Sequence, residues 1–228
     1  MEELLYTTIA HYPELKDTYI IVVETKFYGV QHTLRSYPPL LSLPNKHKDR
    51  VYPIVINNDK NIPNSFYSLS REEQLGIFAH ELAHMLDYAN RTSPQIIGFC
   101  FNWLSKKFVC KLEQATDKTV IRRGLGNSLL LYREKILKKV DPHLEAYFQS
   151  IYLNPDEIRN EKDNKITYFH NQKTPSKSDT KKQGLIGGRL YSIITALSFF
   201  PAIGQMMYLV WIRKMHKKPD WYSKKIKK

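Results

Sequence analysis

The sequence predicts an α+β fold, and three observations lead to this prediction. Runs of β-branched and other apolar residues at 18–25 (TYIIVVET) and 51–57 (VYPIVIN) are typical of strands. Helix-start signals and helical periodicity dominate from Ser70 onwards. The chain has 228 residues, of which 42% are hydrophobic and 25% charged, so it is long and apolar enough to form a packed core.

The N-terminal part contains the predicted sheet. Residues 2–16 are expected to form a short helix or an ordered arm before the first strand. Pro53 cannot donate a ladder hydrogen bond, so the strand at 51–57 is expected at a sheet edge. The segment 36–49 (SYPPLLSLPNKHKD) is broken by prolines and is expected to be a loop.

Helical segments are expected to make up the region that follows. Ser70 and Glu73 form a capping-box pattern, which predicts a helix from Ser70 to about Ala89. Residues 95–123 are expected to form one bent helix or two, ended by Gly124. Further helices are predicted at 127–140, after Asp141-Pro142, and after Asn154-Pro155.

Residues 80–84 (HELAH) form an HExxH motif within the first of these helices. Residues i and i+4 share a helix face, so His80 and His84 can bind one metal ion. Glu81 is turned by about 100° from His80 and can lie beside the metal without binding it. Zn²⁺ accepts imidazole and carboxylate ligands, and a catalytic site keeps one position open for water. The motif therefore predicts a zinc site in which Glu81 acts as general base.

The surroundings of the motif argue against a chance match on a solvated helix face. Apolar residues at 77, 78, 82, 85 and 86 indicate that the helix is largely buried. Buried histidines need polar partners, which a metal ion would provide. Gly76 lies one turn before His80 on the same face and is expected to leave space over the metal.

The third ligand separates the classes of HExxH protein. The metzincin pattern places a glycine and a histidine where this chain has Asp87 and Asn90, so that pattern fails. Downstream, residues 113–117 (EQATD) form an ExxxD pattern. HExxH followed by ExxxD on an antiparallel helix is similar to the signature of gluzincin-type zinc metallopeptidases. The resemblance covers roughly residues 50–125, lies in the motifs only, and fits both small gluzincins and membrane-linked M48-like peptidases.

This resemblance implies that Glu113 is the third zinc ligand and that Asp117 orients the ring of His80. It also implies a zincin-like fold, in which a small, mostly antiparallel sheet packs on the HExxH helix and the C-terminal half is helical. The implied reaction is hydrolysis of peptide bonds in a peptide or protein substrate. In such folds an edge strand above the motif helix pairs with the substrate, and the resemblance gives this role to residues 51–57. An ordinary structural edge strand is the alternative for that segment.

A further side chain is expected to stabilise the oxyanion of the tetrahedral intermediate. Tyr88, His143, Tyr147 and Tyr152 are candidates, and each of them equally fits a structural role. Asp87 is expected on the helix surface rather than beside the metal ligands.

Positive charge is concentrated at the C-terminal end. The formal net charge is +13, and residues 171–228 carry 13 Lys or Arg against two Asp or Glu, whereas the first 170 residues carry 22 against 20. We therefore expect a metallopeptidase domain at 1–170, a basic linker at 171–184, and an apolar helical hairpin or membrane segment with a basic tail at 185–228.

The apolar segment leaves two alternatives open. Residues 190–212 contain no charge over 23 positions, which is long enough to span a bilayer. Pro201 near the middle and basic residues on both flanks fit a hairpin that keeps both flanks on one side. Anionic headgroups would attract those flanks. A hairpin folded against the soluble core is the other reading, and the periodicity does not separate the two.

The remaining features favour an intracellular enzyme. Two cysteines, Cys100 and Cys110, make no disulfide framework, and the N-terminus lacks the long apolar stretch of a secretory signal. We expect a cytoplasmic protein, attached to the inner face of the membrane if 185–228 binds lipid.

The alternative function is a non-catalytic membrane-associated or nucleic-acid-binding protein with a structural metal site. Nucleic acid is the less favoured partner, because the basic residues lie in a tail rather than among aromatics on a folded face. Glu81 favours catalysis, since a structural zinc site needs no general base.

Overall fold

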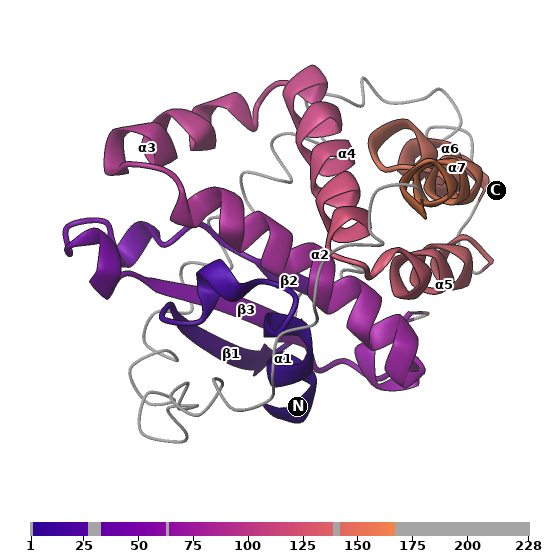
Figure 1. Cartoon of the computed structure of the whole chain (residues 1–228), viewed down its shortest axis with the longest axis horizontal. Coiled ribbons are helices and arrows are strands. Elements are labelled where there is room, and N and C mark those ends of the chain that lie inside the picture. Colours follow the sequence, from indigo (N-terminus) through magenta and orange to yellow (C-terminus); the bar gives the residue numbers. More distant parts are fainter. Residues whose placement is uncertain (1, 27–32, 63, 139–141, 167–228) are drawn as a thin grey trace, which may run out of the picture. The chain divides into compact units, whose positions relative to one another are not determined.

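The computed structural model describes residues 2–26, 33–62, 64–138 and 142–166, and the structural statements below concern this part of the chain. It shows a mixed α+β fold that is mostly helical, with one three-stranded sheet (Figure 1). The strands are β1 (Tyr19–Thr25), β2 (Leu34–Ser36) and β3 (Val51–Asn57). The α+β prediction and the two predicted strands are confirmed. The short strand β2 was not predicted.

The sheet has the order β1-β3-β2, so β3 is its central strand. Strand β1 pairs with β3 in parallel along seven residues, from Tyr19–Val51 to Thr25–Asn57. Strand β2 pairs with β3 antiparallel over three residues. The expectation of a mostly antiparallel sheet is therefore wrong. Parallel neighbours need a long connection, and the 25 residues between β1 and β3 provide it.

The expectation that residues 51–57 form an edge strand is also wrong, and the position of Pro53 explains why. The carbonyl of Pro53 accepts a hydrogen bond from the N–H of Tyr37 at 3.1 Å, one residue beyond the end of β2. The N–H that proline lacks would point to the same side. Its absence therefore falls where the β2 pairing stops, and it leaves the pairing of β3 with β1 intact.

The helices agree with the sequence patterns. They are α1 (Glu2–Ile9), α2 (Arg71–Ala89), α3 (Ser93–Asn102), α4 (Lys106–Arg122), α5 (Gly126–Leu137), α6 (Pro142–Ile151) and α7 (Pro155–Ile166). The region 95–123 forms two helices. Gly124 follows α4 with a φ of +81°, a conformation that favours glycine at a helix end.

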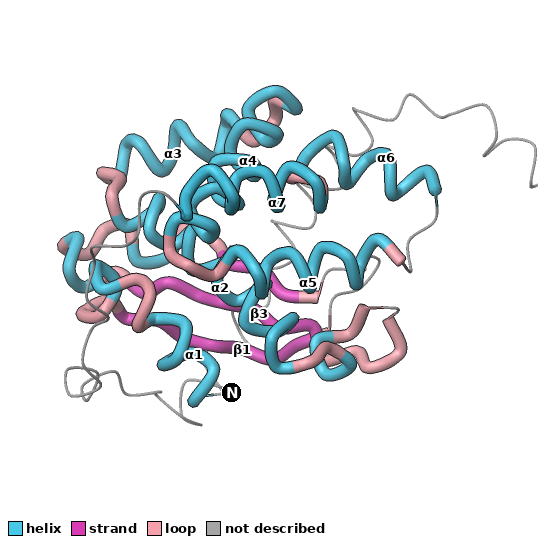
Figure 2. Tube along the Cα trace, turned by 45° about the vertical axis from the view of Figure 1, so that its right-hand side comes forward, coloured by secondary structure: helices cyan, strands magenta, loops and turns pink. Residues whose placement is uncertain are grey.

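Helix α2 lies at the centre of the fold. Figures 1 and 2 show the sheet on one side of α2 and helices α3 and α4 on the other. Helices α1, α4 and α5 and strand β2 pack directly against it. Its residues 76–85 are buried without a break, so both motif histidines lie within the core.

The predicted linker at 171–184 and the apolar segment with its tail at 185–228 lie outside the described residues. Within the described residues, none of the helices has both the length and the apolar character needed to cross a bilayer.

Candidate metal centre

Helix α2 places His80 and His84 one above the other on a buried face. The helix begins with the predicted capping box: the N–H of Glu73 donates to the Ser70 hydroxyl at 3.3 Å, and the Glu73 carboxylate accepts from the N–H of Ser70 at 2.7 Å. This cap fixes where the helix starts and therefore which residues face inwards. Both imidazoles are more than nine-tenths buried.

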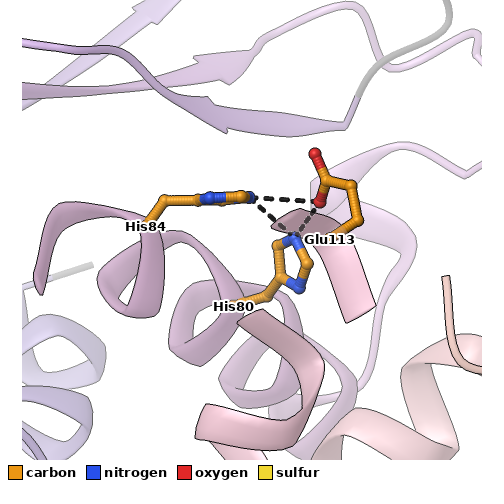
Figure 3. Close-up of side chains that lie close together, drawn as sticks. All are labelled: His80, His84 and Glu113. Atoms are coloured by element: carbon orange, nitrogen blue, oxygen red, sulfur yellow. Dashed lines mark hydrogen bonds and ion pairs between the residues drawn. The ribbon is translucent and has the colours of Figure 1, made fainter. Parts of the chain in front are cut away.

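Helix α4 brings Glu113 to the two rings. One carboxylate oxygen of Glu113 lies 3.0 Å from His80 Nε2 and 3.2 Å from His84 Nε2, and the two Nε2 atoms are 3.1 Å apart (Figure 3). Ligands at 2.0–2.2 Å around a tetrahedral ion are separated by roughly 3.3 Å. The three side chains therefore have the spacing and the chemistry of a metal site, and together they could hold one ion.

Each imidazole has a partner on α4 for its other nitrogen. His80 Nδ1 donates to Asp117 at 2.8 Å. Thr116 donates its hydroxyl hydrogen to the carbonyl of Leu112, so its oxygen can accept from His84 Nδ1 at 3.3 Å. These bonds orient both rings so that their Nε2 atoms point to the position where a metal could bind.

Asp117 is fully buried and is held by three further contacts. Arg133 of α5 donates to both carboxylate oxygens at 3.0 Å, and the N–H of Leu153, between α6 and α7, donates to one of them at 3.0 Å. The Arg133 guanidinium lies over the ring of Tyr152 at 4.2 Å, and that ring stands edge-on to His80. The orientation of His80 thus depends on residues from α4, α5 and the α6–α7 turn.

The charges of this cluster stabilise one another. Burial alone would lower the pKa of His80, but its hydrogen bonds to Asp117 and Glu113 outweigh that effect and raise the pKa to about 10. Burial would raise the pKa of Glu113, yet the two histidines hold it well below its usual range. Glu113 therefore remains a carboxylate, the form that binds metal ions.

Glu81 is hydrogen-bonded to β2. One of its oxygens accepts hydrogen bonds from the N–H of Ser36 at 2.6 Å and from the Ser36 hydroxyl at 2.7 Å. The backbone N–H and C=O groups of Arg35 and Tyr37 point towards β3. Because these groups alternate along a strand, the N–H of Ser36 points to the outer edge of β2. Helix α2 thus meets the free edge of the sheet at this carboxylate.

The structure gives Gly76 a different role from the expected one and places Asp87 as expected. A Cβ atom on Gly76 would lie 2.2 Å from the backbone oxygen of Ser128, so Gly76 permits close packing of α2 on α5 and does not open space over the metal. Asp87 forms an ion pair with Arg91 at 2.8 Å, as expected for a helix-surface carboxylate.

The candidates for oxyanion stabilisation are placed as follows. The ring of Tyr88 stacks on His84 with 6.2 Å between ring centroids and is buried. Tyr152 packs edge-on to His80 at 5.8 Å. The side chains of His143 and Tyr147 lie outside the described residues. Tyr152 is the described candidate that lies beside both His80 and Arg133.

Sequence reasoning missed three residues that support the site. Ser36 lies in a strand of three residues, which is too short to show periodicity. Arg133 contacts Asp117 from the next helix, 16 positions later in the sequence. A sequence signal was available for Thr116: it is adjacent to Asp117 and lies one helical turn after Leu112 on α4.

Comparison of the chain with models of known families, with curated proteins and with solved structures gives no match. What can be said of its chemistry therefore rests on the site itself.

Proposed function

We propose that this chain is a zinc-dependent metallopeptidase of the gluzincin type with a zincin-like arrangement. The observation that carries the proposal is the convergence of His80, His84 and Glu113, with Glu81 on the same helix but outside the cluster. Two imidazoles and one carboxylate suit zinc and leave its fourth position open. A purely structural zinc site is usually closed by four protein ligands.

Zinc, when bound by these three residues, polarises a substrate carbonyl and makes an attacking water more acidic. Glu81 then accepts a proton from that water and returns it to the leaving amine. Asp117 and Thr116 keep the Nε2 atoms of His80 and His84 directed at the metal position. The buried surroundings strengthen each of these electrostatic interactions.

The substrate would be an extended peptide that pairs with the outer edge of β2. Within the described residues no strand pairs with that edge. It carries the backbone groups of Leu34 and the carbonyl of Ser36, while the N–H of Ser36 already donates to Glu81. Pairing there would add a strand to the sheet next to Glu81. This role replaces the one that the sequence had suggested for residues 51–57.

The test combines metal analysis with a peptide-library assay on the full chain. Purified protein should contain about one zinc per chain and should cleave at least one peptide of a diverse library. Glu81→Gln keeps the side-chain shape without the basicity, so it should retain zinc and the fold while losing nearly all cleavage.

Two outcomes would contradict the proposal. A Glu81→Gln variant as active as the unmodified chain would remove Glu81 from the mechanism. A zinc-loaded chain that cleaves nothing in the library would favour the structural metal site instead.

A further inference from the structure

The corner formed by α3 and the start of α4, residues 93–111, exposes an apolar ridge. Ile97, Phe101 and Leu104 are 49%, 68% and 43% exposed, and they are three of the seven large hydrophobic residues that the described part of the chain exposes. Ile97 and Phe101 are four residues apart on α3, so they share one face. Clustered exposed apolar side chains of this size mark interaction surfaces.

The opposite face of α3 already holds the helix in place. Ile96 and Phe99 are buried, and the ring of Phe99 packs on Tyr88 at 5.3 Å and on Phe108 at 5.5 Å. The buried face of α3 therefore packs on the core without any contribution from the ridge. The outward side chains add nothing to the packing of this domain, which leaves their exposure to be explained by a partner.

The corner is positively charged as well as apolar. No Asp or Glu occurs between residues 92 and 112, whereas Lys106, Lys107 and Lys111 are all exposed. Arg91, next to the corner, is neutralised by its ion pair with Asp87. Among the described residues these three lysines form no ion pair. An apolar ridge beside exposed lysines is the arrangement with which short helices bind the headgroup region of anionic bilayers.

We propose that this corner docks on an anionic lipid surface, with Ile97, Phe101 and Leu104 entering the interface and the three lysines contacting headgroups. The charge argues against two other occupants. A second copy would bring like charges together, and the ends of the C-terminal region are strongly basic, with 13 Lys or Arg against two Asp or Glu after residue 170. The uncharged stretch 190–212 is not excluded by charge, and the second experiment below tests it, because a corner covered by that stretch would show blue-shifted emission at position 101 already without vesicles. The inference does not depend on the proposed peptidase activity.

The first experiment measures binding of the full chain to phosphatidylcholine vesicles with and without phosphatidylglycerol. Ile97→Glu/Phe101→Glu should weaken binding to the anionic vesicles at least roughly tenfold, because both apolar insertion and charge attraction are lost. The matched control is Leu41→Glu/Leu131→Glu, which changes two equally exposed leucines elsewhere and should change binding less than about threefold. Unaltered circular dichroism spectra would show that both variants fold.

The second experiment separates the corner from the basic tail, which could bind vesicles by itself. In a Cys100→Ser/Cys110→Ser background, an environment-sensitive fluorophore is attached to Phe101→Cys or, as control, to Leu131→Cys. Saturating anionic vesicles should shift the emission of the probe at 101 to the blue and leave the probe at 131 unchanged. This readout requires no folding-sensitive charge substitution.

If the probe at 101 stays as water-exposed as the probe at 131 while the chain is bound, the proposal is wrong. The same holds if the corner and control double variants bind equally well. Either result would leave an acidic protein surface as the alternative partner of the corner.

Discussion

Ser36 donates two hydrogen bonds to the same oxygen of Glu81, one from its backbone N–H and one from its hydroxyl. The two residues are 45 positions apart and come from β2 and α2. The pair joins the free edge of the sheet to the carboxylate that we propose as general base. Strand β2 therefore positions Glu81 as well as offering an edge for a substrate.

Ser36→Ala should lower kcat about tenfold with little change in KM, because it removes one of two hydrogen bonds to a charged carboxylate. Zinc content should stay at the value of the unmodified chain, and the melting temperature should fall by a few degrees because the buried carboxylate loses a hydrogen bond. Ser36→Thr keeps a hydroxyl at this position and should restore most of the rate. A kcat that is unchanged in Ser36→Ala would show that the hydroxyl has no part in positioning Glu81.

His80→Ala, His84→Ala and Glu113→Ala should each lose most of the bound zinc, measured by elemental analysis after dialysis. Zinc at 100 times its dissociation constant should stabilise the unmodified chain by about 2.7 kcal/mol, and it should not stabilise these variants. His47→Ala, at an exposed position in the short helical turn 47–49, is the matched control and should keep both properties. Stoichiometric zinc in Glu113→Ala would remove Glu113 from the ligand set.

Arg133→Met should destabilise the fold by about 3 kcal/mol, because it leaves Asp117 buried without its ion-pair partner. Zinc affinity should fall roughly tenfold or more, since Asp117 then orients His80 less well. Arg159→Met removes an arginine whose ion pairs with Asp156 and Glu134 are half exposed, and it should change stability by less than about 1 kcal/mol. Chemical denaturation and competitive zinc titration measure the two effects. Equal results for the two variants would contradict the positioning role of Arg133.

Gly76→Ala should destabilise the fold by about 2 kcal/mol, because the added methyl group overlaps the backbone of Ser128 and α5 must move away from α2. Zinc affinity should fall as well, because α5 carries Arg133. Gly98→Ala is the matched control: its Cβ would meet nothing within 4 Å, so it should stabilise α3 by about 0.5–1 kcal/mol. A Gly76→Ala variant with unchanged stability would show that the two helices do not pack this closely.

Local signals accounted for much of the fold. The capping box at Ser70 identified α2, prolines at helix starts identified α6 and α7, and the HExxH and ExxxD motifs pointed to the residues that the structure brings together. These features depend on residues within a few positions of one another. They can therefore be recognised without knowing how distant segments pack.

The features that were missed or wrong depend on distant contacts. The central position of β3 follows from which side of Pro53 meets β2, and the parallel pairing follows from the route of the chain between β1 and β3. The role of Gly76 depends on a helix 50 positions later. Arg133 and Ser36 are unremarkable in sequence because their partners lie in other elements.

Asp117 accepts hydrogen bonds from His80, Arg133 and Leu153, which follow one another in that order along the chain. A ribosome makes the chain in the same order, and domains begin to fold during synthesis. The three residues that could hold a metal are complete once Glu113 has emerged, yet the carboxylate that orients His80 lacks its last donor until Leu153 follows. In nascent chains that end before Leu153, Asp117 would therefore hold the ring of His80 less firmly than in the full chain.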